Sequence, residues 1–122
     1  MGLAAYPDQS SGCVRRAFES GINFFFFYSP GQKQFVEELA PLIQQRRDEV
    51  IVASGSGSRT PGGLRAVRRK ILTAIGAETI DVFFAEYINR GDSAAAVFGR
   101  PEPALVRGVI RPPWIVVAAI IT

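Results

Sequence analysis

Hydrophobic residues in this chain gather into continuous runs that alternate with segments of helical period. Four runs have the length and apolar character of buried strands: Ile22–Tyr28, Val50–Ser54, Ile80–Ile88 and Trp114–Ile121. In the segments between the first three runs, apolar residues recur every three to four positions, as on one face of a helix. Strands that alternate with helices are typical of a parallel sheet. The pattern therefore predicts an α/β domain.

Three segments are predicted to be helices, at about residues 11–20, 32–46 and 63–75. Ser29 and Gln32 have the spacing of a capping box at the start of the second helix. Thr60 and Pro61 are start signals for the third helix, and Gly76 is a stop signal. These signals agree with the strand assignments on either side.

The two ends of the chain carry weaker signals. Residues Leu3–Tyr6 have the composition of an additional short strand, and residues 94–98 and 104–111 are candidates for short helical segments. The continuous run Phe24–Phe27 is expected to pack in a core that covers both faces of its strand. The expectation is thus one domain over residues 1–122 with about four to five parallel strands and three to four helices.

Composition narrows the classes of function. The chain has 122 residues, 48% of them hydrophobic, and a net charge of +3, which is too small to demand a nucleic-acid or membrane partner. It contains no His and a single Cys, so a zinc site or a His-dependent catalytic triad is not expected. With no recognisable leader at its start, a cytoplasmic location is the expectation.

Several segments together resemble the first half of an aldo-keto reductase. The matching pieces are Gly21-Ile-Asn-Phe-Phe, Val50-Ile-Val-Ala, the helix from Leu64 through Arg68-Arg69 to Gly76, and Thr79-Ile-Asp-Val82, in the order and spacing of that family. The resemblance is strongest over residues 1–88, and residues 89–122 diverge. It implies a partial (β/α) TIM-type barrel, since a whole barrel needs roughly 250 residues. One alternative, which the sequence leaves open, is that this chain is a truncated form of a longer protein, because the resemblance fades after about Asp92.

The residues that carry the family's chemistry are replaced. The resemblance implies reduction of carbonyls with NAD(P)H by an Asp, a Tyr, a Lys and a His at the C-terminal ends of the strands. In this sequence the Asp position holds Phe26, the Tyr aligns near Pro30-Gly31, the Lys position holds Gly55, and the His position holds Glu86. Glu at the last position is similar to the family's steroid double-bond reductases. The other three changes remove the family's proton relay.

Two hypotheses follow for the site. The first is an aldo-keto-reductase-like domain without independent catalysis, which acts as a structural or interaction module and forms a homo-oligomer or pairs with a chain that completes the barrel. The second is an NADPH-dependent carbonyl oxidoreductase with an altered site, in which Tyr28 is the acid, Glu86 its partner and Lys33 a nearby charge.

A third hypothesis concerns the loop Ser54–Gly63. A glycine-rich loop between a strand and a helix is a setting for phosphate binding, and Arg59 is the side chain expected to help. The loop lacks the Lys of a phosphate-binding P-loop and the third Gly of a dinucleotide-binding turn. A plain connecting loop is the simpler interpretation.

Overall fold

The computed structural model describes residues 1–7, 9–86, 92 and 96–97. Four strands and three helices follow one another in this part of the chain: β1 (Gly2–Ala4), α1 (Cys13–Glu19), β2 (Phe24–Phe27), α2 (Lys33–Arg46), β3 (Ile51–Ser56), α3 (Pro61–Ile75) and β4 (Val82–Ala85). A short 3₁₀ turn, η1 (Arg47–Glu49), joins α2 to β3. The predicted α/β class is confirmed.

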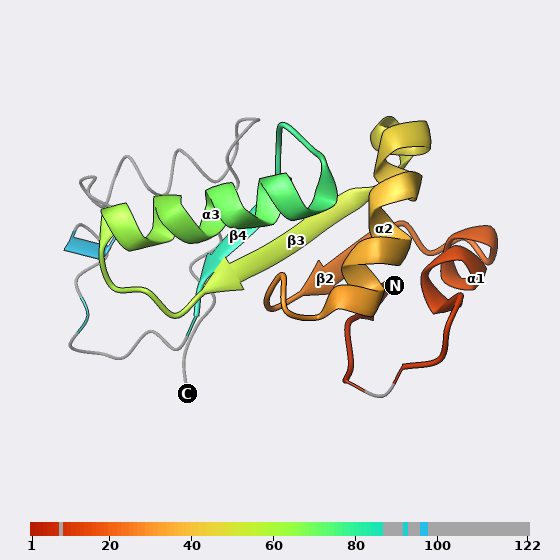
Figure 1. The fold of residues 1–122 in the computed structure, drawn as a ribbon, viewed down its shortest axis with the longest axis horizontal. Coiled ribbons are helices and arrows are strands. Elements are labelled where there is room, and N and C mark those ends of the chain that lie inside the picture. The colour runs from red at the N-terminus through yellow and green to blue at the C-terminus, as the bar shows by residue number, and fades with distance from the viewer. Residues whose placement is uncertain (8, 87–91, 93–95, 98–122) are drawn as a thin grey trace.

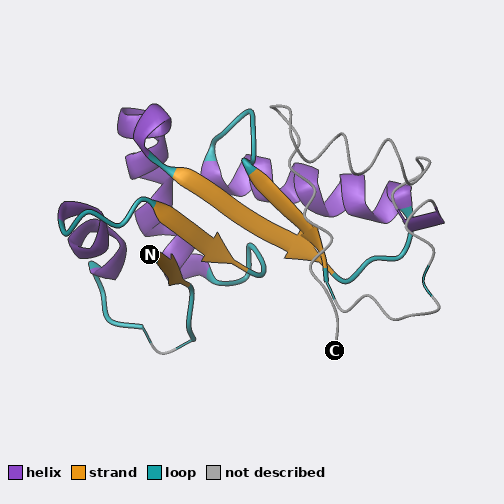
Figure 2. Cartoon of the chain, turned by 180° about the vertical axis from the view of Figure 1, so that it is seen from behind, coloured by secondary structure: helices purple, strands orange, loops and turns teal. Residues whose placement is uncertain are grey.

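All four strands lie parallel in a single sheet, in the order β1-β2-β3-β4 (Figure 1). The spatial order follows the chain order without reversal, as in the wall of a (β/α) barrel and unlike a doubly wound sheet, in which the order reverses. Figures 1 and 2 show α2 and α3 on the same side of the sheet, so the other face has no helix from the described residues over it. This part of the chain therefore forms a barrel wall with its outer helices.

The side chains on the two faces of β2 are buried to different extents. Phe25 and Phe27 are fully buried under the helices, whereas Phe24 and Phe26 on the other face are half-buried. The prediction that both faces of this run are buried was therefore wrong for the described residues. The helices cover one face only, and in a strand successive side chains point to opposite faces.

The core lies between the sheet and the helices. Phe35 of α2 packs against Phe25 and Phe27, with ring centroids 6.5 and 6.1 Å apart. The other buried residues of the cluster come from the sheet, the helices and the segments between them: Ala5, Val14, Val36, Leu39, Ile43, Val50, Val52, Leu64, Ile71, Ile75, Ile80, Phe83, Ala85 and Val97. The helical stripes seen in the sequence therefore face the sheet, as their period requires.

The end signals of the helices were correct for α3 and wrong for α2. Thr60 caps α3 by accepting a hydrogen bond from the Gly63 N–H at 3.1 Å, and Gly76 ends it in the left-handed conformation (φ 65°). Helix α2 begins at Lys33, so Ser29 is not its N-cap. Instead, the Gln32 side chain accepts the Tyr28 N–H at 2.7 Å, which closes the turn before the helix.

Some strand limits also differ from the sequence prediction. Strand β3 continues through Gly55 to Ser56, because these residues pair with Phe84 and Ala85 of β4. The first strand is Gly2–Ala4, and α1 spans Cys13–Glu19. The predicted strand Trp114–Ile121 and the predicted helix at 104–111 lie outside the described residues, as do three of the five residues of the predicted helical segment 94–98. Among the described helices, none is long and apolar enough to cross a membrane.

The N-terminal end of the sheet is closed by an arginine. Arg47 reaches both carboxylate oxygens of Asp81 at 3.0 Å and the Thr79 hydroxyl at 3.1 Å, and it donates to the Val50 carbonyl at 2.9 Å. Asp81 in turn accepts the N–H of Val52 at 2.7 Å. This network ties η1, β3 and the segment just before β4 together at one end of the sheet.

Candidate functional site

The substituted positions of the family site come together on the face without helices, toward the C-terminal ends of the strands. Phe26 pairs in register with Ala53 of β3, and Gly55 pairs with Phe84 of β4. Glu86 follows Phe84 by two residues and so lies on the same side of the sheet. The structure thus brings Phe26, Gly55 and Glu86 to neighbouring places.

Phe26 lies at the centre of three aromatic rings. Its ring centroid is 4.6 Å from that of Tyr28 and 5.6 Å from that of Phe84, and both pairs are edge-to-face. Such perpendicular arrangements are the favoured geometry for aromatic pairs. The position that the resemblance gives to a carboxylate is therefore an apolar contact between β2 and β4.

Gly55 leaves the space that the Glu86 side chain uses. A Cβ built on Gly55 would lie 2.7 Å from Oε1 of Glu86 and 3.0 Å from the Phe84 carbonyl oxygen. Real Cβ atoms hardly ever approach so closely, so only Gly fits while Glu86 keeps this conformation. The position expected to carry an ammonium is occupied by a carboxylate from the neighbouring strand.

The Glu86 carboxyl has an unusual environment. Its Oε1 is buried and has no hydrogen-bond partner among the residues that the structure describes. Burial raises the pKa of this carboxyl above its usual value, because the charged form loses hydration without gaining a partner. A perturbed carboxyl at the C-terminal end of a barrel strand is a candidate functional group.

The three members of the proposed alternative site do not form a hydrogen-bonded set. The Tyr28 side chain is 52% exposed and packs by its ring against Phe26. Lys33 is exposed at the start of α2. Within the described part of the chain, no hydrogen bond or ion pair joins Tyr28, Lys33 and Glu86. Tyr28 directly follows β2 and Glu86 directly follows β4, and the sequence alone could not give the distances between these groups.

Arg59 is not free to meet a phosphate. Its guanidinium forms an ion pair with Asp92 at 3.2 Å and donates to the Gly57 carbonyl at 3.1 Å. Thr60 already satisfies one N–H at the start of α3. Moreover, Ser54 to Ser56 belong to β3, so the loop is shorter than predicted. These residues do not fit a dinucleotide phosphate without rearrangement.

An apolar groove runs beside the aromatic rings on the same face. It has a volume of about 340 Å³ and is lined by Gly2, Leu3, Ala4, Phe24, Phe26 and Phe84. Sequence analysis missed this groove because it treated Phe24 and Phe26 as core residues. The signal was the period of two in the run, which separates Phe24 and Phe26 from their buried neighbours.

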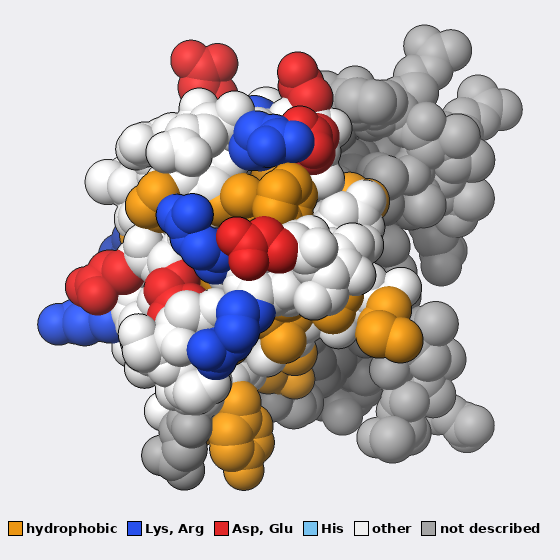
Figure 3. All heavy atoms as spheres, turned by 90° about the vertical axis from the view of Figure 1, so that its right-hand side faces the viewer, with side chains coloured by type: hydrophobic (Ala, Val, Ile, Leu, Met, Phe, Trp, Pro, Cys, Tyr) orange, Lys and Arg blue, Asp and Glu red, His pale blue; other side chains and the backbone are white. Residues whose placement is uncertain are grey.

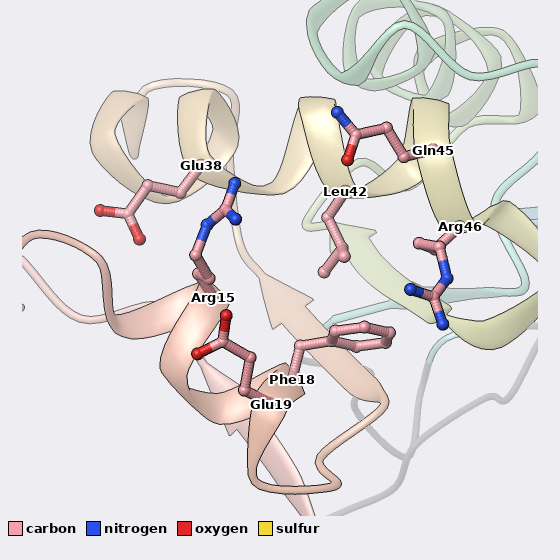
Figure 4. A pocket seen from close by; sticks show the side chains of 7 residues that line it. All are labelled: Arg15, Phe18, Glu19, Glu38, Leu42, Gln45 and Arg46. Carbon is pink, nitrogen blue, oxygen red and sulfur yellow. The ribbon is translucent and has the colours of Figure 1, made fainter.

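A smaller hollow of about 160 Å³ lies on the outer side, between α1 and α2 (Figure 4). Phe18 and Leu42 form its apolar part, and Arg46 lies over the Phe18 ring at 5.5 Å. Glu38 at its rim accepts the backbone N–H groups of Gly12 and Val14. Figure 3 shows acidic and basic side chains interspersed over this side of the molecule. The hollow therefore lacks a field of one sign that would select a charged ligand.

The described residues contain no cluster of His, Cys, Asp or Glu that could hold a metal ion. No protein-family model matches the sequence. No curated protein matches it either.

Solved structures match the fold. One, a candidate aldo-keto reductase from Pseudomonas aeruginosa, aligns with a TM-score of 0.62 and 16% identity over 88% of this chain and 50% of that chain. Another structure of a candidate aldo-keto reductase from this organism aligns with a TM-score of 0.54 and 17% identity over 68% of this chain and 39% of that chain. This chain thus spans half or less of the length of these proteins. The resemblance seen in the sequence is confirmed at the level of fold: the described strands and helices form part of an aldo-keto-reductase-like barrel.

Proposed function

We propose that this chain is a barrel-wall module that acts by association and does not reduce carbonyls by itself. The observation that carries the proposal is the content of the family site. An aromatic contact at Phe26 stands in place of the carboxylate, and the Glu86 side chain fills the space over Gly55. General acid–base reduction needs a proton donor held beside the substrate by a group that tunes its pKa.

Two features support association. The sheet face that carries the apolar groove has no described helix over it, whereas parallel sheets are normally covered on both faces. Strand β1 pairs with β2 alone among the described strands, so its outer edge can receive another strand. A second copy of the chain or a chain that completes the barrel would cover both.

The test combines activity and assembly of the purified full chain. We expect no NADPH-dependent reduction of aromatic aldehydes, and sedimentation velocity should show an assembly that dissociates on dilution. Phe24→Asp, which places a charge in the groove, should weaken the assembly. Ala66→Asp on the exposed side of α3 is the matched control and should leave it intact. A chain that stays monomeric at all concentrations and binds no other chain would contradict the proposal.

A second candidate function is an NADPH-dependent oxidoreductase with an altered site. The observation in its favour is the raised pKa of Glu86, since a carboxyl that stays protonated can donate a proton. Titration with NADPH, followed by cofactor fluorescence, tests it directly. Saturable binding with turnover of a carbonyl, abolished in Glu86→Gln, would favour the enzyme over the module.

A further inference from the structure

Helix α3 lies on the outer side of the sheet, and its exposed face carries positive charge without negative charge (Figure 1). One side of the helix packs into the core through Leu64 and Ile71. The opposite side is a stripe of exposed residues at helical spacing: Arg65, Ala66, Arg69, Lys70, Thr73 and Ala74. We call the three cations of this stripe the basic strip. No Asp or Glu occurs in α3.

The cations of the basic strip are free in the part of the chain that the structure describes. Arg65, Arg69 and Lys70 form no ion pair with a described residue. By contrast, the exposed Arg46 is paired with Glu49. Arg68 flanks the strip, but it is half-buried and has an interaction already, so it does not belong to this set. The strip is therefore accessible to a partner that supplies negative charge.

The basic strip does not serve the stability of α3. Arg65 and Arg69 are four residues apart, and like charges at this spacing repel each other across one turn. The helix dipole favours acidic residues in the first turn and basic residues in the last turn, and α3 has neither. Charges that disfavour the helix they stand on are expected where they serve a function instead.

The shape of the exposed face suits a second helix. Ala66, Thr73 and Ala74 are short side chains, so a partner can approach the cations closely. Residues i and i+4 are about 6 Å apart along a helix axis, so carboxylates one turn apart in a partner helix match the spacing of Arg65 and Arg69. A guanidinium can bind a carboxylate through two parallel hydrogen bonds.

The extent of the basic strip favours an acidic protein segment over nucleic acid. The strip covers only about 8 Å of the helix axis from Arg65 to Lys70. Tight binding of a duplex depends on many phosphate contacts, which so short a strip does not supply. The exposed face of α3 also has no aromatic side chain on which a base could stack.

We propose that the basic strip binds an acidic helical segment of a partner protein, with carboxylates one turn apart placed on Arg65 and Arg69 and with Lys70 beside them. The strip and the apolar groove lie on opposite sides of the sheet. This interaction therefore goes beyond the association proposed above and does not depend on it.

The test uses a fluorescently labelled alanine-based peptide with Glu at every fourth position, titrated with the full chain and followed by anisotropy. The same peptide with Gln in place of each Glu is the neutral analogue. At low ionic strength we expect the acidic peptide to bind about tenfold more tightly than the neutral one. Added salt should reduce this difference, because exposed charges are screened. Equal affinity for the two peptides, or no binding of the acidic one, would overturn the proposal.

A DNA duplex titrated in parallel tests the other class of polyanion. We expect it to bind more weakly than the acidic peptide at the same ionic strength. Tighter binding of the duplex, lost on substitution of the same arginines, would overturn the proposal in favour of a nucleic-acid partner.

Two double variants show whether the strip or the net charge attracts the peptide. Arg65→Gln with Arg69→Gln should lower the affinity for the acidic peptide to that for the neutral one. Arg15→Gln with Arg46→Gln removes the same charge from exposed positions on α1 and α2, and should leave most of the affinity. Equal losses in the two double variants would contradict the assignment to the strip.

A single substitution separates this interaction from the association proposed above. Ala66→Asp places a carboxylate among the cations and should weaken binding of the acidic peptide, whereas Ala66→Asn, of similar size, should not. Phe24→Asp, which should weaken the assembly, should leave peptide binding unchanged. If the assembly persists while the peptide fails to bind, the strip proposal is wrong and the module proposal stands. If the peptide binds a chain that never assembles, the reverse holds. Near-ultraviolet circular dichroism shows whether each variant keeps its tertiary packing.

Discussion

The two ends of the sheet differ in whether their charged side chains have partners. At the N-terminal end, Arg47 and Asp81 hold each other and satisfy backbone groups of the strands. At the C-terminal end, an oxygen of Glu86 has no partner among the described residues, and the Glu86 side chain occupies the space over Gly55. In barrels of this kind the N-terminal ends serve stability and the C-terminal ends carry the site. The contrast therefore makes the Glu86 end the candidate functional end, even though the residues of the family site are replaced.

The largest expected effect is at the stabilising end. Asp81→Ala removes the ion-pair partner of Arg47. It also removes the acceptor of the backbone N–H of Val52, a fully buried residue. We expect the free energy of unfolding to fall by about 3 kcal/mol, because hydrogen bonds to charged groups are the stronger kind and the orphaned groups cannot all be hydrated. Urea unfolding followed by circular dichroism measures it.

The control for this change keeps the acceptor and removes the charge. Asp81→Asn can still accept the Val52 N–H, so its cost should be clearly smaller than that of Asp81→Ala. Equal losses in both variants would mean that the ion pair, and not the hydrogen bond to the strand, closes this end. A negligible loss in both would remove the contrast between the two ends.

The next effect tests the close approach of Glu86 to Gly55 at the other end of the sheet. Gly55→Ala would place a methyl group 2.7 Å from the Glu86 carboxylate and 3.0 Å from a carbonyl oxygen of β4. We expect a loss of about 2 kcal/mol from overpacking. Gly57→Ala is the matched control, because nothing lies within 4 Å of its added Cβ. A loss in Gly57→Ala as large as that in Gly55→Ala would point to chain entropy or backbone effects in place of the close approach.

A double mutant shows how much of this loss comes from Glu86. In the Glu86→Ala background, the methyl group meets only the carbonyl oxygen, so Gly55→Ala should cost about 1 kcal/mol less than in the original chain. Additive effects would mean that the carboxylate moves away at no cost. In that case it would not be held over Gly55.

The sequence predicts the fold of this molecule further than it predicts the geometry of the candidate site. Apolar periods and helix end signals such as Thr60 and Gly76 are local, so the strands and helices follow from them and the parallel sheet follows from their alternation. The capping box at Ser29 failed because the Gln32 side chain closes the turn before α2. That choice depends on where the turn packs, which the local sequence does not contain.

The candidate site was predictable in its residues and not in its geometry. The resemblance placed Phe26, Gly55 and Glu86 at the family's catalytic positions. It did not show that Glu86 lies over Gly55, because this contact joins two strands through a register that only the sheet defines. The contrast in burial between Phe26 and Phe27 also depends on which face the helices cover. Nonlocal packing therefore decides what the substituted site can do.

A smaller effect concerns the charge of Glu86. Because its pKa is raised by burial, the folded chain binds this proton more tightly than the unfolded chain does. Stability from this group is present at low pH and falls as the pH rises from the usual carboxyl pKa of about 4.3 through the higher value in the fold. Glu86→Gln should abolish this fall, so the variant should gain stability relative to the original chain between pH 4 and pH 7.

Urea unfolding at both pH values checks this, with Glu37→Gln as the exposed control. If the two variants shift alike with pH, Glu86 is not desolvated in solution, and the contrast with the paired Asp81 disappears. A loss of stability in Glu86→Gln at pH 7 would instead show that the carboxylate has found a partner.

The smallest expected effect comes from a comparison of two adjacent arginines, Arg46 and Arg47, at the N-terminal end of the sheet. Arg46 forms an ion pair with Glu49, and both of these side chains are 51% exposed. The neighbouring Arg47 is more buried and binds the residues that precede β3 and β4. Arg46→Gln should leave the unfolding midpoint unchanged within error, since exposed ion pairs contribute little to stability and are screened by salt. Arg47→Gln should lower it clearly. Equal losses would mean that the exposed pair, together with the stacking of Arg46 on Phe18, contributes as much as the network between the strands. Stability at this end would then come from the helix surface as well as from the sheet.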